Sequence, residues 1–170
     1  MPLSKERNLK MKTLFPEISP FKTHHLEVDS THNVYVEESG NPEGKPVIFL
    51  HGGPGGGTGP KQRQFFDPSH YRIILFDQRG CGKSVPNGEI INNTTKHLID
   101  DIETIRKHLL INEWLLFGGS WGSTLALAYA CKYPHLVKGM ILRGIFLSRP
   151  FELSWFLREV KIFFPEKYES

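Results

Sequence analysis

Four short runs of apolar residues recur along the chain, and each is bounded by glycine or polar residues. The runs occupy residues 46–50, 71–76, 114–117 and 137–142. Runs of this length are typical of strands that are buried on both faces, as strands of a parallel sheet are. The pattern therefore predicts a parallel sheet built from these four segments.

Segments with helical periodicity lie between and after the apolar runs. Residues 94–110 begin at Asn93 or Thr94 as the cap and carry an apolar face made by Leu98, Ile102, Ile105 and Leu109. Residues 123–131 are rich in alanine and leucine, which favour helix. Residues 151–164 predict a third helix with an apolar stripe of Leu153, Phe156, Leu157, Val160 and Phe164. Alternating strands and helices predict an α/β domain with right-handed crossovers.

The first forty residues predict a different arrangement. Residues 1–20 contain three prolines and little periodicity, so we expect an arm there. Residues 24–28 and 33–38 alternate between apolar and polar positions, with turn residues between them. This pattern predicts an antiparallel hairpin next to the parallel strands.

Composition is that of a globular protein and excludes several classes. Apolar residues make up 39% of the 170 positions and charged residues 23%. The 21 basic and 18 acidic residues are spread along the chain, so we expect no nucleic-acid partner. No apolar run reaches the roughly 18–20 residues of a membrane span. Only two cysteines and a polar N-terminus favour a reducing, cytoplasmic location.

The segment Gly118–Gly122 carries the strongest chemical signal. Its sequence, Gly-Gly-Ser-Trp-Gly, fits the pattern G-x-S-x-G, with a predicted strand before it and a predicted helix after it. This context is typical of a nucleophile elbow, which exposes a serine hydroxyl so that a histidine can accept its proton. We therefore predict Ser120 as a nucleophile. The alternative is a strand–helix loop that is rich in glycine and serine and has no chemical role.

A second glycine-rich segment, residues 51–57, follows an earlier predicted strand. A serine hydrolase needs two backbone N–H groups that bind the oxyanion. One comes from the residue after the nucleophile, here Trp121, and the other from a loop after an earlier strand. Glycine allows the backbone to approach the substrate closely. The alternatives are a flexible loop or a nucleotide-phosphate loop, although the pattern G-x-G-x-x-G leading into a helix is not evident.

A third glycine-rich segment, residues 77–84, is similar to a phosphate-binding P-loop but does not match it. The P-loop pattern requires glycine where Asp77 stands, and Pro86 opposes a helix after the segment. We instead expect Asp77 and Arg79 to brace the neighbouring loops.

Five segments that occur in order carry a resemblance to a known family. They are residues 51–57 (HGGPGGG), 76–84 (FDQRGCGKS), 92–95 (NNTT), 118–130 (GGSWGSTLALAYA) and 142–146 (LRGIF). Together they resemble the proline iminopeptidases (prolyl aminopeptidases), serine peptidases of the α/β-hydrolase fold, from about residue 21 to residue 146. The resemblance implies a mostly parallel sheet with an N-terminal antiparallel hairpin. It also implies removal of N-terminal proline from peptides in the cytoplasm, without a metal or an organic cofactor.

The resemblance also assigns roles to single residues. It implies that Ser120 forms an acyl-enzyme and that the N–H groups of Gly53 and Trp121 form the oxyanion hole. It further implies that Phe146 lines a pocket for the pyrrolidine ring and that Arg143 supports the site from close by.

The sequence departs from the family pattern after Ser120. The triad order on this fold is serine, then aspartate or glutamate, then histidine. No aspartate follows Ser120, and the one later histidine, His135, is expected at a surface helix end. The later glutamates lie in or after the last predicted helix. We therefore expect an N-terminal portion of the enzyme, truncated before the last strands and most of the cap. Its expected parts are an arm (1–20), a core (21–148) and the start of a helical cap (149–170).

Such a portion has predictable properties. Residues 137–142 would form an exposed sheet edge, which favours self-association, and activity would be very weak without the histidine. Three hypotheses stay open: a proline iminopeptidase, another α/β hydrolase such as an esterase, or a catalytically dead fragment that acts by binding. Epoxide hydrolases and dehalogenases use an aspartate nucleophile, and Ser120 argues against them.

Overall fold

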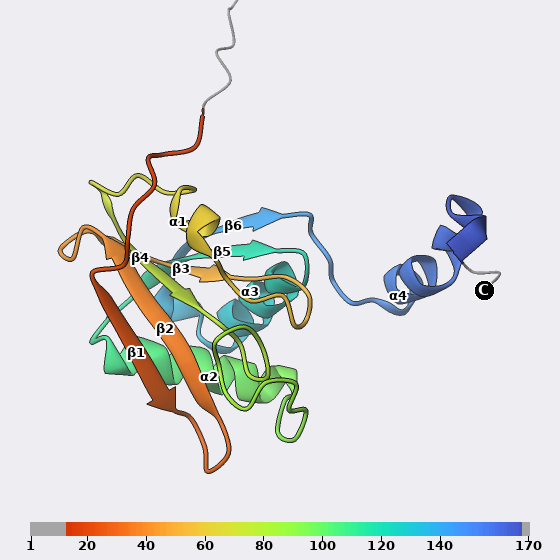
Figure 1. The fold of residues 1–170 in the computed structure, drawn as a ribbon, viewed down its shortest axis with the longest axis horizontal. Coiled ribbons are helices and arrows are strands. Elements are labelled where there is room, and N and C mark those ends of the chain that lie inside the picture. Colours follow the sequence, from red (N-terminus) through yellow and green to blue (C-terminus); the bar gives the residue numbers. More distant parts are fainter. Residues whose placement is uncertain (1–12, 168–170) are drawn as a thin grey trace, which may run out of the picture.

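The structure, a computed structural model, describes residues 13–167, in which six strands form one sheet (Figure 1). In sequence order the strands are β1 (Lys22–Glu27), β2 (Asn33–Gly40), β3 (Lys45–Leu50), β4 (Tyr71–Phe76), β5 (Trp114–Gly119) and β6 (Val137–Arg143). Their order across the sheet is β1-β2-β4-β3-β5-β6. β2 is antiparallel to β1 and to β4, whereas the other neighbours are parallel. The predicted hairpin and parallel strands are thus confirmed, and their bounds differ from the predicted ones by at most two residues.

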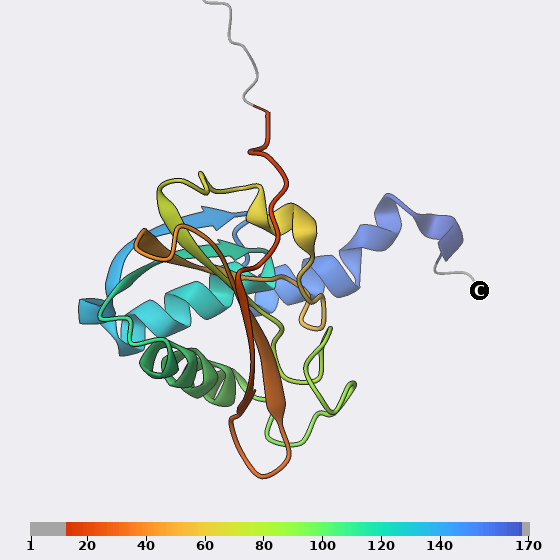
Figure 2. The same cartoon turned by 60° about the vertical axis from the view of Figure 1, so that its left-hand side comes forward.

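Helices cover the two faces of the sheet unequally (Figure 2). Among residues 13–167 the α-helices are α1 (Pro60–Arg63), α2 (Thr95–His108), α3 (Trp121–Lys132) and α4 (Pro150–Leu157), of which α4 covers neither face. α2 and α3 pack on one face, while the short α1 and residues from the N-terminal arm lie on the other. Within residues 13–167, none of the helices combines the length and the apolar character that crossing a membrane requires.

The larger core lies beneath α2 and α3. All four residues of the predicted apolar face of α2 are buried there, against side chains of β3, β4 and β5. Burial of each such side chain contributes about 1.5–3 kcal/mol. A smaller core on the opposite face contains Phe49, Phe66 and Leu75, with Ile18 packed against it. The two cores hold β3 and β5 in a fixed plane, and the elbow follows β5.

Polar contacts fix the short helix α1, which the sequence reasoning missed. Arg63 at its end is buried and donates from Nε to Oε1 of Glu37 in β2 at 2.7 Å. The Tyr35 hydroxyl donates to the same carboxylate at 2.8 Å. Arg63 also binds the Ile18 carbonyl at 3.0 Å, so the arm is held by the same side chain. The only sequence signal for α1 is Pro60, a residue favoured at the first helical position.

The predictions for the N-terminal arm and for the last helix agree with the structure to different extents. Of residues 1–20, the structure describes 13–20, which form neither helix nor strand, and residues 1–12 lie outside the described part. The division of the chain into arm, core and cap stays a prediction. The predicted helix over 151–164 is wrong in extent, because α4 ends at Leu157 and a separate 3₁₀ turn, η2 (Glu159–Ile162), follows.

The apolar side chains of α4 explain this difference. Phe151, Trp155 and Phe156 are all exposed, and the segment leads away from the sheet (Figure 1). A helical stripe is stabilised mainly by packing against a partner. Within residues 13–167, the core clusters include no residue of this segment. The apolar stripe therefore does not pack on either core, and this packing is what would stabilise the helix beyond Leu157.

Arg79 and Asp77 brace the loops at the carboxyl ends of the strands, as predicted. Arg79 is 3% exposed and Asp101 of α2 is 1% exposed. Two bonds join them: Nε to Oδ2 at 2.6 Å and Nη2 to Oδ1 at 2.7 Å. Asp77 accepts from the N–H groups of Thr58 at 2.6 Å and Lys83 at 2.8 Å. The loops after β3 and β4 are therefore held to each other, and the loop after β4 is held to α2.

We predict that Arg79→Ala lowers the free energy of unfolding by about 3–5 kcal/mol, because it leaves the Asp101 carboxylate buried without its partner. Urea unfolding measures this loss. The control is Lys96→Ala, which breaks an exposed pair with Asp100 and costs about 1 kcal/mol or less. The double variant Arg79→Met/Asp101→Leu should recover part of the loss. A cost for Arg79→Ala no larger than that of the control would contradict the prediction.

Candidate active site

Ser120 occupies the sharp turn between β5 and α3. Its φ and ψ angles are 54° and −123°, a region that costs a non-glycine residue about 1–3 kcal/mol. Its N–H donates to the Arg143 carbonyl of β6 at 2.9 Å, and its carbonyl accepts from the Ser123 N–H at 2.8 Å. These bonds hold the strained turn from both sides. The predicted strand–turn–helix context of Ser120 is confirmed.

Two glycines let the surrounding backbone segments approach closely. A Cβ at Gly122 would lie 1.9 Å from the Leu50 carbonyl oxygen, and one at Gly118 would lie 2.3 Å from the Gly122 carbonyl oxygen. Atoms cannot approach this closely, so only glycine fits at both positions. The first turn of α3 therefore packs directly on the ends of β3 and β5, and the Ser120 side chain is left exposed at the turn.

Ser120 opens into a hollow of about 300 Å³ at the carboxyl edge of the sheet. Besides Ser120, its lining residues are Phe49, His51, Gln62, Arg143 and five glycines. The structure thus brings Ser120 and Arg143 together in one hollow. The exposed hydroxyl is accessible to an acyl group.

The other predicted site residues occupy different places. Trp121 is the first residue of α3, where a helix does not use its own N–H. Gly53 belongs to the loop after β3, whose neighbouring residues Gly52 and Gly56 line the hollow. Phe146 lines a separate cavity of about 270 Å³ with residues of α4. The Phe146 main chain, by contrast with its side chain, is held near the elbow, because its N–H donates to Ser123 Oγ at 3.0 Å.

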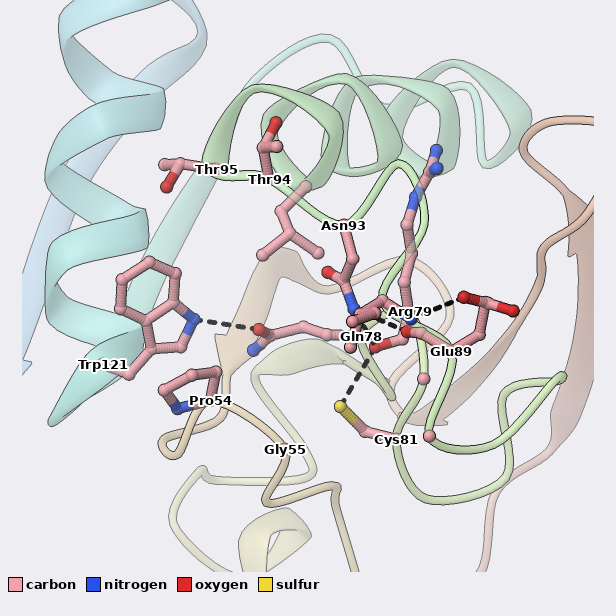
Figure 3. A pocket seen from close by; sticks show the side chains of 14 residues that line it. Pro54, Gly55, Gln78, Arg79, Cys81, Glu89, Asn93, Thr94, Thr95 and Trp121 are labelled. Carbon is pink, nitrogen blue, oxygen red and sulfur yellow. Dashed lines mark hydrogen bonds between the residues drawn. The ribbon is translucent and has the colours of Figure 1, made fainter.

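A larger cavity of about 510 Å³ lies on the other side of the loop after β3 (Figure 3). Pro54 and Gly55 of that loop, Trp121 of α3 and Gln78 after β4 contribute to its wall. The loop that contains Gly53 therefore separates two hollow regions. Sequence reasoning named the segment that contains Gln78 but gave this residue no role.

His51 lies buried at the root of the same loop. Its Nδ1 lies 2.9 Å from the Gly52 carbonyl oxygen, and its Nε2 lies 3.0 Å from the backbone nitrogen of Gln78. Nδ1 also lies 3.2 Å from the Gly57 nitrogen. Because the Gln78 N–H makes Nε2 an acceptor, a neutral ring carries its hydrogen on Nδ1, which then donates to the Gly52 carbonyl and cannot accept from the Gly57 N–H. Burial lowers the pKa of His51, which favours this neutral form. Both ring nitrogens are engaged, so His51 acts as a brace rather than as a proton acceptor for Ser120.

The remaining candidates for the triad lie elsewhere. His135 is exposed in the 3₁₀ turn η1 (Pro134–Leu136), beyond the far end of α3. The length of that helix, about 18 Å at 1.5 Å per residue, separates it from the elbow. In the part of the chain that the structure describes, His51 is the one histidine that lines the hollow. No group of three or more His, Cys, Asp or Glu residues in the described part could hold a metal ion.

Comparison with known proteins identifies the class and then the relatives. The alpha/beta hydrolase fold family matches residues 45–169, and the chain belongs to this family. Its relatives are proline iminopeptidases. The one from Arabidopsis thaliana is 56% identical over 155 residues, which is 91% of this chain and 41% of that protein. The one from Xanthomonas citri is 54% identical over 160 residues, with 94% and 51% covered.

The chain spans about half the length of the curated relatives that it matches. Among solved structures, a proline iminopeptidase-related protein from Thermus thermophilus has a TM-score of 0.62 and 28% identity, covering 71% of this chain and 43% of that one. An epoxide hydrolase from Vigna radiata has a TM-score of 0.67 at 23% identity, covering 84% and 46%. Because its identity is below 25%, the similarity to the epoxide hydrolase supports the fold of this chain and no shared function. The predicted fold and the resemblance to proline iminopeptidases are confirmed.

The buried neutral His51 predicts a pH dependence of stability. Its pKa is lowered in the folded protein, so below about pH 6.5 the unfolded chain binds a proton that the folded protein does not. The free energy of unfolding should therefore decrease as the pH falls below that value.

We expect His51→Gln to reduce the stability difference between pH 7.5 and pH 5.5, measured by urea unfolding at each pH. The exposed His135→Gln variant should keep the wild-type difference. Equal pH dependence in wild type and His51→Gln would show that His51 does not titrate differently on folding.

Proposed function

We propose that this chain carries the nucleophile-bearing part of a serine aminopeptidase that releases N-terminal proline from peptides. The observation that carries the proposal is Ser120 on a strained, exposed elbow, in a chain that is 52–56% identical to proline iminopeptidases. The enzyme acts in the cytoplasm and uses neither a metal nor an organic cofactor. Its substrate is a peptide whose first residue is proline.

The proposed reaction has two steps. Ser120 Oγ attacks the prolyl carbonyl carbon and loses its proton, the peptide C–N bond breaks, and the remaining peptide leaves as an amine that takes up the proton. Water then attacks the prolyl ester, releasing proline and restoring the hydroxyl. The N–H groups of Trp121 and Gly53 stabilise the oxyanion in both steps.

We propose that the proton acceptor and its orienting acid lie in the portion of the relatives that this chain does not span. The hollow contains His51 alone among the histidines of residues 13–167, and His51 has both ring nitrogens engaged. In a serine–histidine–acid system, loss of the histidine alone costs about a millionfold in rate. We therefore propose that the chain by itself is a poor catalyst that still presents its nucleophile.

Two more residues shape the proposed site. Arg143 lines the hollow, and its proposed role is to support the reacting groups through its positive charge. Phe146 lines the pocket for the pyrrolidine ring, three residues further along the same segment. In the described structure its cavity is shared with α4, so the ring pocket depends on how α4 is placed.

We expect Ser120→Ala to abolish covalent labelling by an aryl phosphonate and any release of proline from a proline aryl-amide. Intact-protein mass spectrometry measures the label, and absorbance measures the released amine. Hydrolysis of an acetyl aryl ester in place of the proline amide would instead favour an esterase. Equal labelling of wild type and Ser120→Ala would overturn the assignment of the nucleophile.

A binding function is the second candidate, and the edge strand β6 favours it. Within residues 13–167, β6 pairs with β5 on one side only. Its Met140 and Ile141 are 42% and 54% exposed. An apolar edge of this kind is a template for pairing with another strand. We propose that two copies associate through β6.

Sedimentation velocity at increasing protein concentration tests this association. We expect the wild type to form dimers or larger species. We expect Met140→Lys to raise the dissociation constant of the dimer about tenfold, which shifts the distribution towards monomer. Ile90→Lys places the same charge at an exposed position outside the sheet and should leave the distribution unchanged. A monomeric wild type, or equal effects of the two lysines, would contradict pairing through β6.

A further inference from the structure

The Gln78 side chain joins the loop after β3 to the first residue of α3, and Figure 3 shows its bond to the Trp121 indole. Gln78 is 1% exposed, and both ends of its amide have partners. Its Nε2 donates to the His51 carbonyl at 2.9 Å, and its Oε1 accepts from the Trp121 indole at 3.1 Å. Its backbone N–H also donates to His51 Nε2 at 3.0 Å. One residue after β4 therefore contacts both the root of the loop after β3 and the first residue of α3.

The two proposed oxyanion donors stand on those two segments. The Trp121 N–H begins α3, and the Gly53 N–H lies two residues after His51. An oxyanion hole works only when both donors lie about 2.7–3.1 Å from the developing charge. Backbone contacts at Gly122 fix α3, but a glycine-rich loop has more conformational freedom than other segments. Its position relative to Trp121 therefore needs a separate restraint.

We propose that Gln78 is a positioning residue, which sets the distance between the two oxyanion donors by holding the His51 carbonyl and the Trp121 indole together. The proposal rests on the proposed function of Ser120. Gln78 touches no reacting atom in this arrangement, because it lines the cavity on the far side of the loop rather than the hollow that contains Ser120. Its effect passes through His51 and Trp121.

The chemistry of the amide explains why glutamine suits this position. The His51 carbonyl needs a donor and the Trp121 indole needs an acceptor, and a primary amide supplies both from one side chain. Glutamate has the same shape but lacks the donor, so it would break the bond to the loop. Leucine removes both bonds and leaves the two partners unpaired. The two variants thus separate the link to the loop from the link to the helix.

The first experiment measures the phosphonylation of Ser120 by an aryl phosphonate, whose P–O⁻ group mimics the oxyanion. We expect Gln78→Leu and Gln78→Glu to lower the maximal rate of labelling about 10- to 100-fold, with little change in the concentration for half-maximal rate. Gln64→Leu is the matched control, since the Gln64 carbonyl contacts the N-terminal arm away from the hollow. Equal rates for wild type and both Gln78 variants would overturn the proposal.

A second measurement does not depend on labelling. The chain has three tryptophans, so the indole N–H of Trp121 can be assigned in a ¹⁵N spectrum by loss of its signal in Trp121→Phe. We expect Gln78→Leu to speed hydrogen exchange of this indole and to shift the backbone N–H signals of Gly53 and Trp121 together. Gln78→Glu should shift the Gly53 signal more than the indole signal, and Gln64→Leu should move neither.

The two measurements separate the proposal from the proposed function. If wild type is not labelled, the proposed function fails for this chain, and the spectra alone decide the role of Gln78. Coupled shifts of Gly53 and Trp121 in a folded Gln78→Leu protein would then support the positioning role. Unchanged signals at both residues would overturn it, whether or not Ser120 reacts.

Discussion

The contact between the Leu50 carbonyl and the α-carbon of Gly122 determines where everything else at this site can lie. No side chain fits between them, so the end of β3 presses directly on the first turn of α3. β5 must then turn sharply to enter the helix, and Ser120 takes up the strain of that turn. A positive φ at a residue with a side chain persists only where its surroundings hold it. Here the partners are the Arg143 carbonyl and the Ser123 N–H.

Around this contact, polar side chains join loops that the apolar cores do not reach. The larger core ends beneath α2 and α3, and the loops after β3 and β4 extend beyond it. Arg79 ties one of these loops to Asp101, and Gln78 ties it to both His51 and Trp121. Bonds between buried polar groups are stronger than exposed ones, and they are costly to leave unmade. The carboxyl edge of the sheet is therefore held by a few specific pairs.

The sequence predicted the parts of the fold that follow from local patterns. Short apolar runs identified the strands, and the spacing of Leu98 and Ile102 identified the buried face of α2. The elbow was predictable because its glycines and its serine lie within five residues. By contrast, the extent of α4 depends on packing partners, and the separation of Phe146 from Ser120 depends on the path of the chain after β6.

The polar ties were the least predictable feature of the site. Gln78 bonds to residues that lie 27 and 43 positions away, which no periodicity encodes. His51 was visible beside the glycine-rich loop, but its role follows from the two groups that face its ring nitrogens. The residue types were thus evident from the sequence, whereas their partners required the tertiary structure. The roles of Ser120, Trp121, Gly53, Phe146 and Arg143 stay predictions.

The hollow at Ser120 has an unusual evolutionary property because of what lines it. Five of its ten lining residues are glycines, which have no side chain to shorten. Substitution at these positions can only make the hollow smaller. A lineage adapting to bulkier acyl groups would have to change Phe49, His51, Gln62 or Arg143, the larger residues of the wall. Selection for substrate size therefore acts on few positions, and at the glycine positions the hollow already has the maximum size that substitution allows.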